Sequence, residues 1–262
     1  MFVLKLKVFY NYIISMNKLR LFFLILLYSA SFSNNKALAQ QKNTDSVLLH
    51  QTTANMAGAF YKTIGDRSRL YNGPAVDPYD FRSATNANFK DTAAFNNGNV
   101  NYDGILYTNV PLIYNINRDL LISRIINGFA TYSLLSDRVA EFDLLGHHFI
   151  RLPADSLNKL NEAGFYDQLY NNKLLLLARR TKEIEQEAIS RGVGKFFVEK
   201  TSYFLKKGRT YYSVNSQGKF LDVLKDKKKE LKQYIKDNKL KFGDNPERVM
   251  TMLAAYYDHL TN

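Results

Sequence analysis

Apolar and polar residues alternate through the middle of the chain, and turn residues separate the alternating stretches. Stretches of this kind cover 100–107, 108–116, 118–125 and 130–152. Four more stretches follow, "FYDQLY" and "KLLLLARR" around Asn171–Asn172, and then "KFFVEKTSYFLKK" and "RTYYSV" around Gly208. Alternation with a period of two is typical of strands with one buried face. The pattern predicts about eight strands paired in sequence order, which favours an antiparallel meander over βαβ units.

The stretch "NVNYDGILYTNV" (99–110) has two interpretations. Asn99, Asn101, Asp103 and Gly104 occupy positions of a calcium-binding loop, but its twelfth position is Val110 instead of a bidentate glutamate. A single carboxylate is too little charge for such a site. Asp-Gly between alternating apolar positions instead predicts a two-residue hairpin turn, since both residues tolerate positive φ angles.

Helical periodicity is confined to the ends of the chain and to one short connection. Residues 45–64 predict an N-terminal helix, and 153–164 predict a short capped helix that ends at a glycine. The segment 216–262 predicts a pair of helices, the second of them capped by Asn245 with Pro246 at its first position. The fold class is therefore α+β, a sheet with an N-terminal helix and two C-terminal helices.

Residues 65–98 have few aliphatic side chains and many Gly, Asn, Asp, Pro, Ser and Thr residues. A loop of this length inside a domain is unusual, and spaced aromatic side chains indicate that it packs on the rest of the protein. It would cover a sheet edge or line the rim of a cleft. Its aromatic residues are Tyr71, Tyr79, Phe81, Phe89 and Phe95.

The N-terminus has the three parts of a secretory signal peptide. Lys18 and Arg20 precede the apolar run 21–33, and Ala37-Leu38-Ala39 supplies the small-x-small cleavage pattern. The run is shorter than a membrane span requires. Residues 1–39 are therefore predicted to be removed, leaving a mature chain that begins at Gln40.

Two features bear on this assignment. "MNKLRLFFL" from Met16 would be a complete signal peptide by itself, which makes Met16 an alternative start. An uncleaved membrane anchor is the competing interpretation, against which "ALAQ" argues. The expected mature chain, 40–262, has no transmembrane span and forms one α+β domain. Because the sequence has no cysteine, neither a disulfide nor a lipidated cysteine is available.

Positive charge is concentrated near the C-terminus. The formal net charge is +12, and 219–241 contains nine lysines against Asp222, Asp226, Glu230 and Asp237. An exported protein does not meet cytoplasmic nucleic acid, so anionic lipid or an acidic glycan is the expected counterpart. A solvated lysine-rich helix face with no partner is the simpler explanation and is favoured over such a counterpart.

Catalytic motifs are absent from the sequence. It contains no G-x-S-x-G elbow, no H-E-x-x-H helix and no glycine-rich phosphate loop. His147 and His148 are neighbours in a predicted strand and would point to opposite faces. Glu141, Asp143 and His147 would share a face, but a strand places Asp143 and His147 about 13 Å apart, too far for an acid–base pair. A polar cluster at a hairpin end is the expected arrangement. The remaining histidines are His50 and His259.

Asp77 and Asp80 in the long loop are the other candidate carboxylates, and turn formation is their ordinary role. The 18 tyrosines and 18 phenylalanines would line a groove for an apolar or sugar ligand, or more simply pack across strands. No catalytic residue, metal ligand or cofactor is expected, and the ligand-binding residues are not assigned.

Three aromatic-rich or lysine-rich pieces, "LYNGP" (70–74), "VNYDGILYTNVPL" (100–112) and "KKKELKQYIKDNKL" (227–240), occur in an order that resembles exported cell-envelope proteins of the Bacteroidetes. That resemblance implies a periplasmic, outer-membrane-associated or extracellular location. The leading hypothesis is a non-enzymatic envelope protein with a binding or structural role. The alternatives are a periplasmic carrier of a lipid or other apolar ligand and a secreted hydrolase that uses carboxylates of the 65–98 loop.

Overall fold

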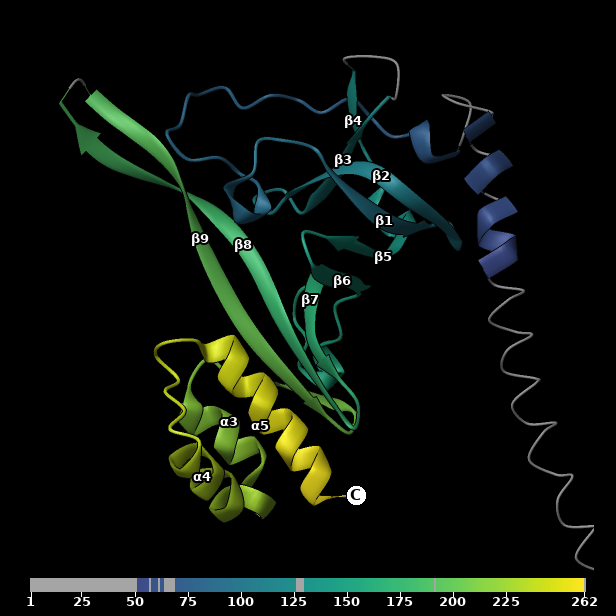
Figure 1. Cartoon of the computed structure of the whole chain (residues 1–262). Coiled ribbons are helices and arrows are strands. Elements are labelled where there is room, and N and C mark those ends of the chain that lie inside the picture. Colours follow the sequence, from purple (N-terminus) through teal and green to yellow (C-terminus); the bar gives the residue numbers. More distant parts are fainter. Residues whose placement is uncertain are drawn as a thin grey trace, which may run out of the picture. The chain divides into compact units, whose positions relative to one another are not determined.

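One antiparallel sheet of ten strands organises the protein (Figure 1). The computed structural model describes residues 51–56, 58–60, 62–63, 69–125, 130–190 and 192–261. The order of strands across the sheet is β10-β9-β8-β7-β6-β5-β1-β2-β3-β4. The strands are β1 (Asn96–Tyr102), β2 (Ile105–Asn115), β3 (Leu120–Arg124), β4 (Thr131–Ser133), β5 (Val139–Leu144), β6 (His147–Leu152), β7 (Gly164–Asn171), β8 (Leu174–Ile189), β9 (Gly192–Lys207) and β10 (Thr210–Ser213).

The sheet consists of two meanders that meet where β1 pairs with β5. This arrangement confirms the predicted α+β class and antiparallel pairing, with ten strands in place of about eight. The excess arises in 130–152, which contains β4, β5 and β6. Leu145 (φ 53°) and Gly146 (φ 79°) turn the chain between β5 and β6. Leu145 is a poor residue for positive φ, so the sequence pattern gave no turn signal there.

The hairpin interpretation of 99–110 is correct. Tyr102 pairs with Ile105, and the two residues between them, Asp103 (φ 53°) and Gly104 (φ 76°), both have positive φ. A two-residue turn of this kind matches the twist of the flanking strands.

Aromatic side chains form the core on one face of the β1–β7 part of the sheet. Phe142 and Phe149 stack with their ring centroids 4.7 Å apart, and Tyr114 lies edge-on to both at 5.2 and 5.1 Å. Phe165 adds an edge-on contact to Tyr114 at 5.8 Å. These buried rings come from alternate positions of four strands, so the tyrosines and phenylalanines here serve packing.

A second core lies between the C-terminal helices and the β7–β10 end of the sheet (Figure 1). The helices are α3 (Gln217–Val223), α4 (Lys228–Asp237) and α5 (Pro246–Leu260), and the 3-10 turn η6 (Lys225–Lys227) joins the first two. The single helix expected before Asn245 is therefore broken in two. The start of α5 is as predicted, with Asn245 accepting from the Arg248 N–H and Pro246 in the first turn.

The predicted helix over 153–164 is wrong. Only one 3-10 turn forms, η5 (Ser156–Asn158), and Lys159 ends it with a φ of 66°. Leu160, which is 1% exposed, then returns to bond with the backbone of Asp155. Burial of the leucine and this backbone pairing override the local helical pattern. Gly164, expected to end the helix, begins β7.

The long loop packs on the sheet, as expected, and covers the free edge of β4. The Ser133 N–H donates to the Pro74 carbonyl at 2.9 Å, and Ala75 bridges to Tyr132. Gly73 permits this approach, because a Cβ there would lie 1.8 Å from the Ser133 carbonyl oxygen.

The N-terminal helix is seen only in part. Residues 51–56, in a first unit (Met1–Met56), are helical. Residues 58–60 and 62–63 are also helical and belong to the second unit (Ala57–Asn262), which contains the sheet. The predicted signal peptide lies outside the described residues. None of the helices in the described ranges has the length and apolar character needed to cross a membrane.

The sequence pattern did not predict the length of the β8–β9 hairpin. Its strands pair continuously from Leu174–Lys207 to Ile189–Gly192, but β7 follows β8 only as far as Ala178. The distal half is therefore a two-stranded ribbon that extends beyond the neighbouring strands (Figure 1).

Candidate functional site

The two adjacent histidines lie on opposite faces of β6, as predicted. His147 Nδ1 is 2.7 Å from Asp167 Oδ2, and His148 Nδ1 is 2.7 Å from Asp143 Oδ1. His148 also lies 3.8 Å from Glu141. The expectation that His147 shares a face with Asp143 and Glu141 is wrong, because the turn after β5 reverses the chain and sets His148 opposite Asp143. This trio is a half-exposed polar cluster at a hairpin end.

His147 and Asp167 have the geometry of an imidazole–carboxylate pair, which orients a general base in many hydrolases. Asp167 is 1% exposed, and the same oxygen that faces His147 also accepts from Arg180. No described hydroxyl group hydrogen-bonds to His147, whose ring packs against Phe89 at 5.0 Å. In the described part of the chain the pair is therefore not part of a hydroxyl–histidine–aspartate triad.

Asp77 and Asp80, the loop carboxylates, are both exposed. Neither side chain has a hydrogen bond or ion pair with the described residues. Only the backbone carbonyl of Asp77 is engaged, accepting from Arg118 Nη1 at 2.5 Å. The two carboxyl groups are therefore not held by partners that would position them for acid–base catalysis.

A buried ion network joins the sheet to α5. Arg180 donates to Asp167 at 2.5 and 2.9 Å, and it binds both oxygens of Glu247 at 2.9 and 3.0 Å. Tyr203 donates to Glu247 at 3.1 Å. Burial works to lower the pKa of Arg180, but the bonds to Glu247 and Asp167 outweigh it and raise that pKa above its usual value. With its donors committed to two carboxylates, Arg180 fixes the helix on the sheet.

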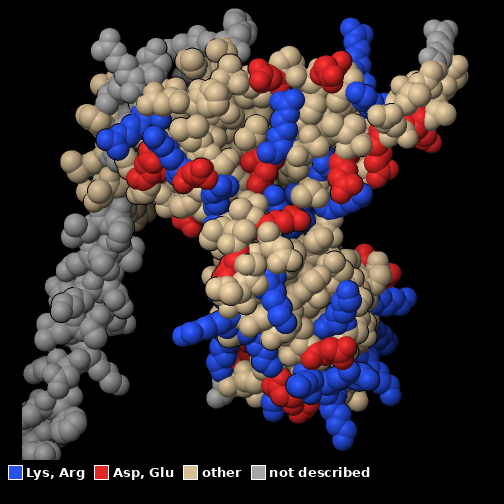
Figure 2. Space-filling model, turned by 180° about the vertical axis from the view of Figure 1, so that it is seen from behind, with Lys and Arg blue, Asp and Glu red and all other residues tan. Residues whose placement is uncertain are grey.

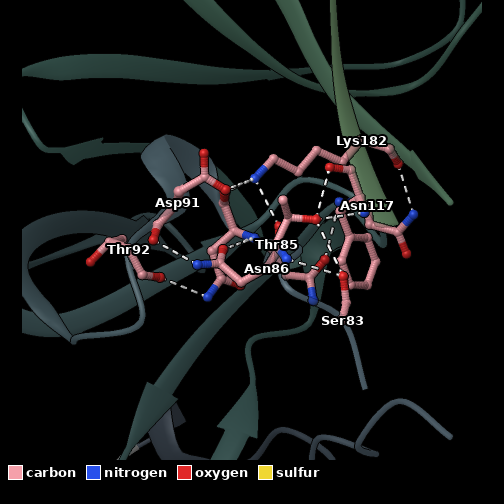
Figure 3. Close-up of polar contacts among 10 residues, drawn as sticks. Ser83, Thr85, Asn86, Asp91, Thr92, Asn117 and Lys182 are labelled. Atoms are coloured by element: carbon pink, nitrogen blue, oxygen red, sulfur yellow. Dashed lines mark hydrogen bonds and ion pairs between the residues drawn. The ribbon is translucent and has the colours of Figure 1, made fainter. Parts of the chain in front are cut away.

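Lys182 forms a second buried centre, which holds the long loop to β8 (Figure 3). Its side chain is 2% exposed, and Nζ donates to the carbonyls of Asn86 and Asn88 at 2.8 and 2.9 Å. Its third proton goes to Asp91 at 2.5 Å. The Lys182 carbonyl accepts from Asn117 at 2.7 Å. An ammonium group with three donors and three acceptors is saturated, so this centre is structural.

In contrast to these buried centres, exposed lysines gather over the C-terminal helices (Figure 2). On α4 the side chains of Lys229, Lys232 and Lys236 are exposed. Their spacing of three and four places them on one face of the helix, while Leu231 is buried on another. Among the described residues, none of these three lysines has a carboxylate within ion-pairing distance. They form a stripe of uncompensated positive charge, which we call the lysine stripe.

A groove of about 500 Å³ adjoins this stripe at the start of α4. Its two carboxylates already have partners, since Asp226 binds Lys207 at 2.6 Å and Glu230 lies 3.9 Å from Lys227. Partial burial acts to raise the pKa of Asp226, but the hydrogen bonds from Lys207 and Tyr257 hold it below its usual value. Asp226 is therefore an anion whose charge is already balanced by Lys207. The lining consists of Lys225, Asp226, Lys228, Lys229, Glu230 and Lys232.

The exposed lysines set the charge of this surface. No side chain caps the N-terminus of α4, but the Lys228 N–H donates to the Lys225 carbonyl of η6. An exposed row of ammonium groups favours an anion such as a phosphate group. The lysine stripe and the adjoining groove are the candidate functional site.

Sequence reasoning located this segment by its lysine count, within the predicted range 219–241. It did not show which of these lysines have ion-pair partners. In the structure Lys228 binds Asp222 at 2.6 Å and Lys227 approaches Glu230, so these two are not free. The two buried centres were missed, since nothing in the sequence marks Arg180 or Lys182 as internal. Within the described ranges, no three His, Asp or Glu side chains converge as metal ligands would.

Comparison with protein-family models, with curated proteins and with solved structures gives no match to this chain.

Proposed function

We propose that this chain is a non-enzymatic, exported protein of the bacterial envelope whose lysine stripe binds anionic lipid headgroups. The observation that carries the proposal is the exposed row Lys229, Lys232 and Lys236, which forms no ion pair with any described carboxylate. Basic residues of this kind gain about 1 kcal/mol each at an anionic bilayer surface. The predicted signal peptide would deliver the protein to a compartment where such surfaces are within reach.

The competing hypotheses lack a supporting observation. A carrier needs an enclosed apolar space, whereas the sheet ends in two edge strands, β10 and β4, and the groove at α4 is open and lined by charges. A hydrolase would need partners for Asp77 and Asp80, and in the described part of the chain their side chains have none.

Vesicle binding tests the lipid role. The unchanged chain should bind vesicles that contain phosphatidylglycerol at low salt, and not vesicles of phosphatidylcholine alone. Charge reversal of Lys229, Lys232 and Lys236 to Glu should weaken binding by more than about 100-fold, since three contributions of about 1 kcal/mol are lost. Co-sedimentation over a range of salt concentrations measures this, because screening should weaken the unchanged chain as well.

The matched control reverses Lys62, Arg82 and Lys90, which are exposed, lie outside the C-terminal helices and have no ion pair with the described residues. This variant has the same net charge as the first and should keep most of the binding. Equal loss in both variants would show that only net charge matters and would contradict a site on α4. Binding of soluble polygalacturonate without binding to vesicles would replace the lipid by an acidic glycan.

Export has its own test. N-terminal sequencing of the protein purified from its own cells should give Gln40 as the first residue, because Ala37-Leu38-Ala39 supplies the cleavage pattern. A cytosolic protein that retains residues 1–39 would refute the envelope assignment.

A further inference from the structure

The edge strand β10 has backbone N–H and C=O groups that are not hydrogen-bonded by any other described strand. Strand β10 pairs only with β9 and ends the sheet. The Val214 N–H donates to the Tyr203 carbonyl at 2.9 Å, which fixes the alternation of bonded pairs along the two strands. Hydrogen-bonded pairs recur every second residue in antiparallel strands. The N–H and C=O groups of Tyr211 and Ser213 therefore point away from β9, toward the open edge.

The chain covers parts of two other strand edges with its own loops. The edge of β4 receives the 73–75 segment through the Pro74 carbonyl. On the outer edge of β9, the Thr85 hydroxyl accepts from the Phe197 N–H at 2.8 Å and donates to its carbonyl at 3.1 Å. No described residue bonds the outward backbone groups of Ser213, which is exposed, whereas Tyr211 is only 6% exposed. An uncovered edge of this kind is a template for another strand.

A groove runs beside this open edge, with a volume of about 420 Å³. One wall comes from the loop before β7, the other from α3, and the edge strand with Phe204 of β9 supplies the apolar surface between them. The residues that matter here are Lys159, Phe204, Tyr211, Ser213, Lys219 and Val223. A groove between an edge strand and a helix is the setting in which extended peptides add to a sheet.

The charges of the groove select the occupant. Lys159 and Lys219 are exposed, and neither has an ion pair in the described part of the chain. Asp222, the one carboxylate in the lining, is bound to Lys228 at 2.6 Å. The groove therefore presents two free ammonium groups, and its partner should have negative side chains.

We propose that β10 binds an extended, acidic peptide segment of a partner protein, which adds to the sheet as an eleventh strand. The outward N–H and C=O groups of the exposed Ser213 would bond the peptide backbone, while Lys159 and Lys219 engage its carboxylates. This proposal does not depend on lipid binding, because it uses a different groove and different lysines.

The probe is a display library of heptapeptides with glutamate at alternate positions and random residues between them, selected on the full chain. Selection should enrich a set of peptides. Ser213→Pro removes one outward N–H and should weaken the best peptide by at least 10-fold. Ser213→Ala keeps that N–H and should bind within about twofold of the unchanged chain.

A second measurement uses the unchanged chain and alters only the peptide. Methylation of alternate backbone nitrogens of the selected peptide should abolish binding in one of the two possible registers and spare it in the other, since only one set of N–H groups faces β10. Lys159→Gln combined with Lys219→Gln should weaken binding and reduce its salt dependence, whereas Lys232→Gln on α4 should not.

Three results would overturn the proposal: no peptide enriched, equal binding by the Ser213→Pro and Ser213→Ala variants, or equal binding by both methylated peptides. Binding of polygalacturonate that Ser213→Pro leaves unchanged would mark the groove as a site for acidic saccharides and would also overturn it.

Discussion

Arg180→Met is expected to lower the free energy of unfolding by about 3–5 kcal/mol, the largest effect of any single substitution at a polar residue of this protein. The guanidinium group lies between Asp167 and Glu247, and its removal leaves Asp167, which is 1% exposed, as a buried charge with only His147 as a remaining partner. The penalty comes from that uncompensated carboxylate more than from the loss of packing. Urea unfolding followed by circular dichroism measures it.

Two further variants distinguish this cause from general damage. Arg138→Met removes an arginine from an exposed pair with Asp103, 3.4 Å long, and should cost less than about 1 kcal/mol. Asp167→Asn added to Arg180→Met removes the orphaned charge and should recover at least about 1 kcal/mol. If Arg180→Met costs no more than Arg138→Met, the ion network does not anchor α5 on the sheet.

Lys182→Met should be the second most damaging change, at about 2–4 kcal/mol. Methionine fits the path of the side chain but cannot donate, so the carbonyls of Asn86 and Asn88 lose their common partner. Asp91 is more than half exposed and stays hydrated, so most of the cost lies in these two carbonyls. Equilibrium unfolding in urea gives the total.

Hydrogen exchange locates the effect of that change. The Ile116 N–H, which donates to the Ala87 carbonyl at 3.0 Å, should lose protection as the loop detaches from the sheet. Lys200→Met is the matched control, because Lys200 is an exposed lysine on β9 that pairs with Glu183, and it should change the stability far less than Lys182→Met does. Unchanged protection of Ile116 in Lys182→Met would show that the loop is held by its aromatic contacts instead.

The strands near turns with strong signals were predictable. Asp103–Gly104 and Gly208 have positive φ angles, and the apolar alternation on either side fixes the register of each hairpin. Leu145 in the turn after β5 gave no such signal, and the prediction joined two strands into one. The misplacement of His147 beside Asp143 follows directly from that error.

In the β8–β9 ribbon, local sequence preference favours a different secondary structure from the one that forms. Residues 181–189, "TKEIEQEAI", consist largely of good helix formers. In the structure Glu183, Glu185 and Glu187 lie on one face of β8, opposite Val198, Phe196 and Gly194 of β9. Continuous pairing with β9 decides the conformation, and only the tertiary structure contains that information.

The candidate site, too, was only partly predictable from the sequence. The lysine count of 219–241 and the amphipathic pattern of the helices place a basic surface near the C-terminus, and the sequence suffices for that. Which lysines are free depends on where Asp222, Asp226 and Glu230 reach, and those contacts span η6 and β9.

By itself the sequence determined the antiparallel α+β class, the Asp-Gly hairpin, the start of α5 and the basic character of the C-terminal segment. Each of these follows from neighbouring residues, through alternation, turn chemistry, capping or local charge. The tertiary structure alone decided the burial of Arg180 and Lys182, the pairing that extends β8 and β9, and the uncovered edge of β10. Each of these depends on which distant segments meet, because the free energy of a buried charge or an open strand edge is set by the groups around it and not by its neighbours in the chain.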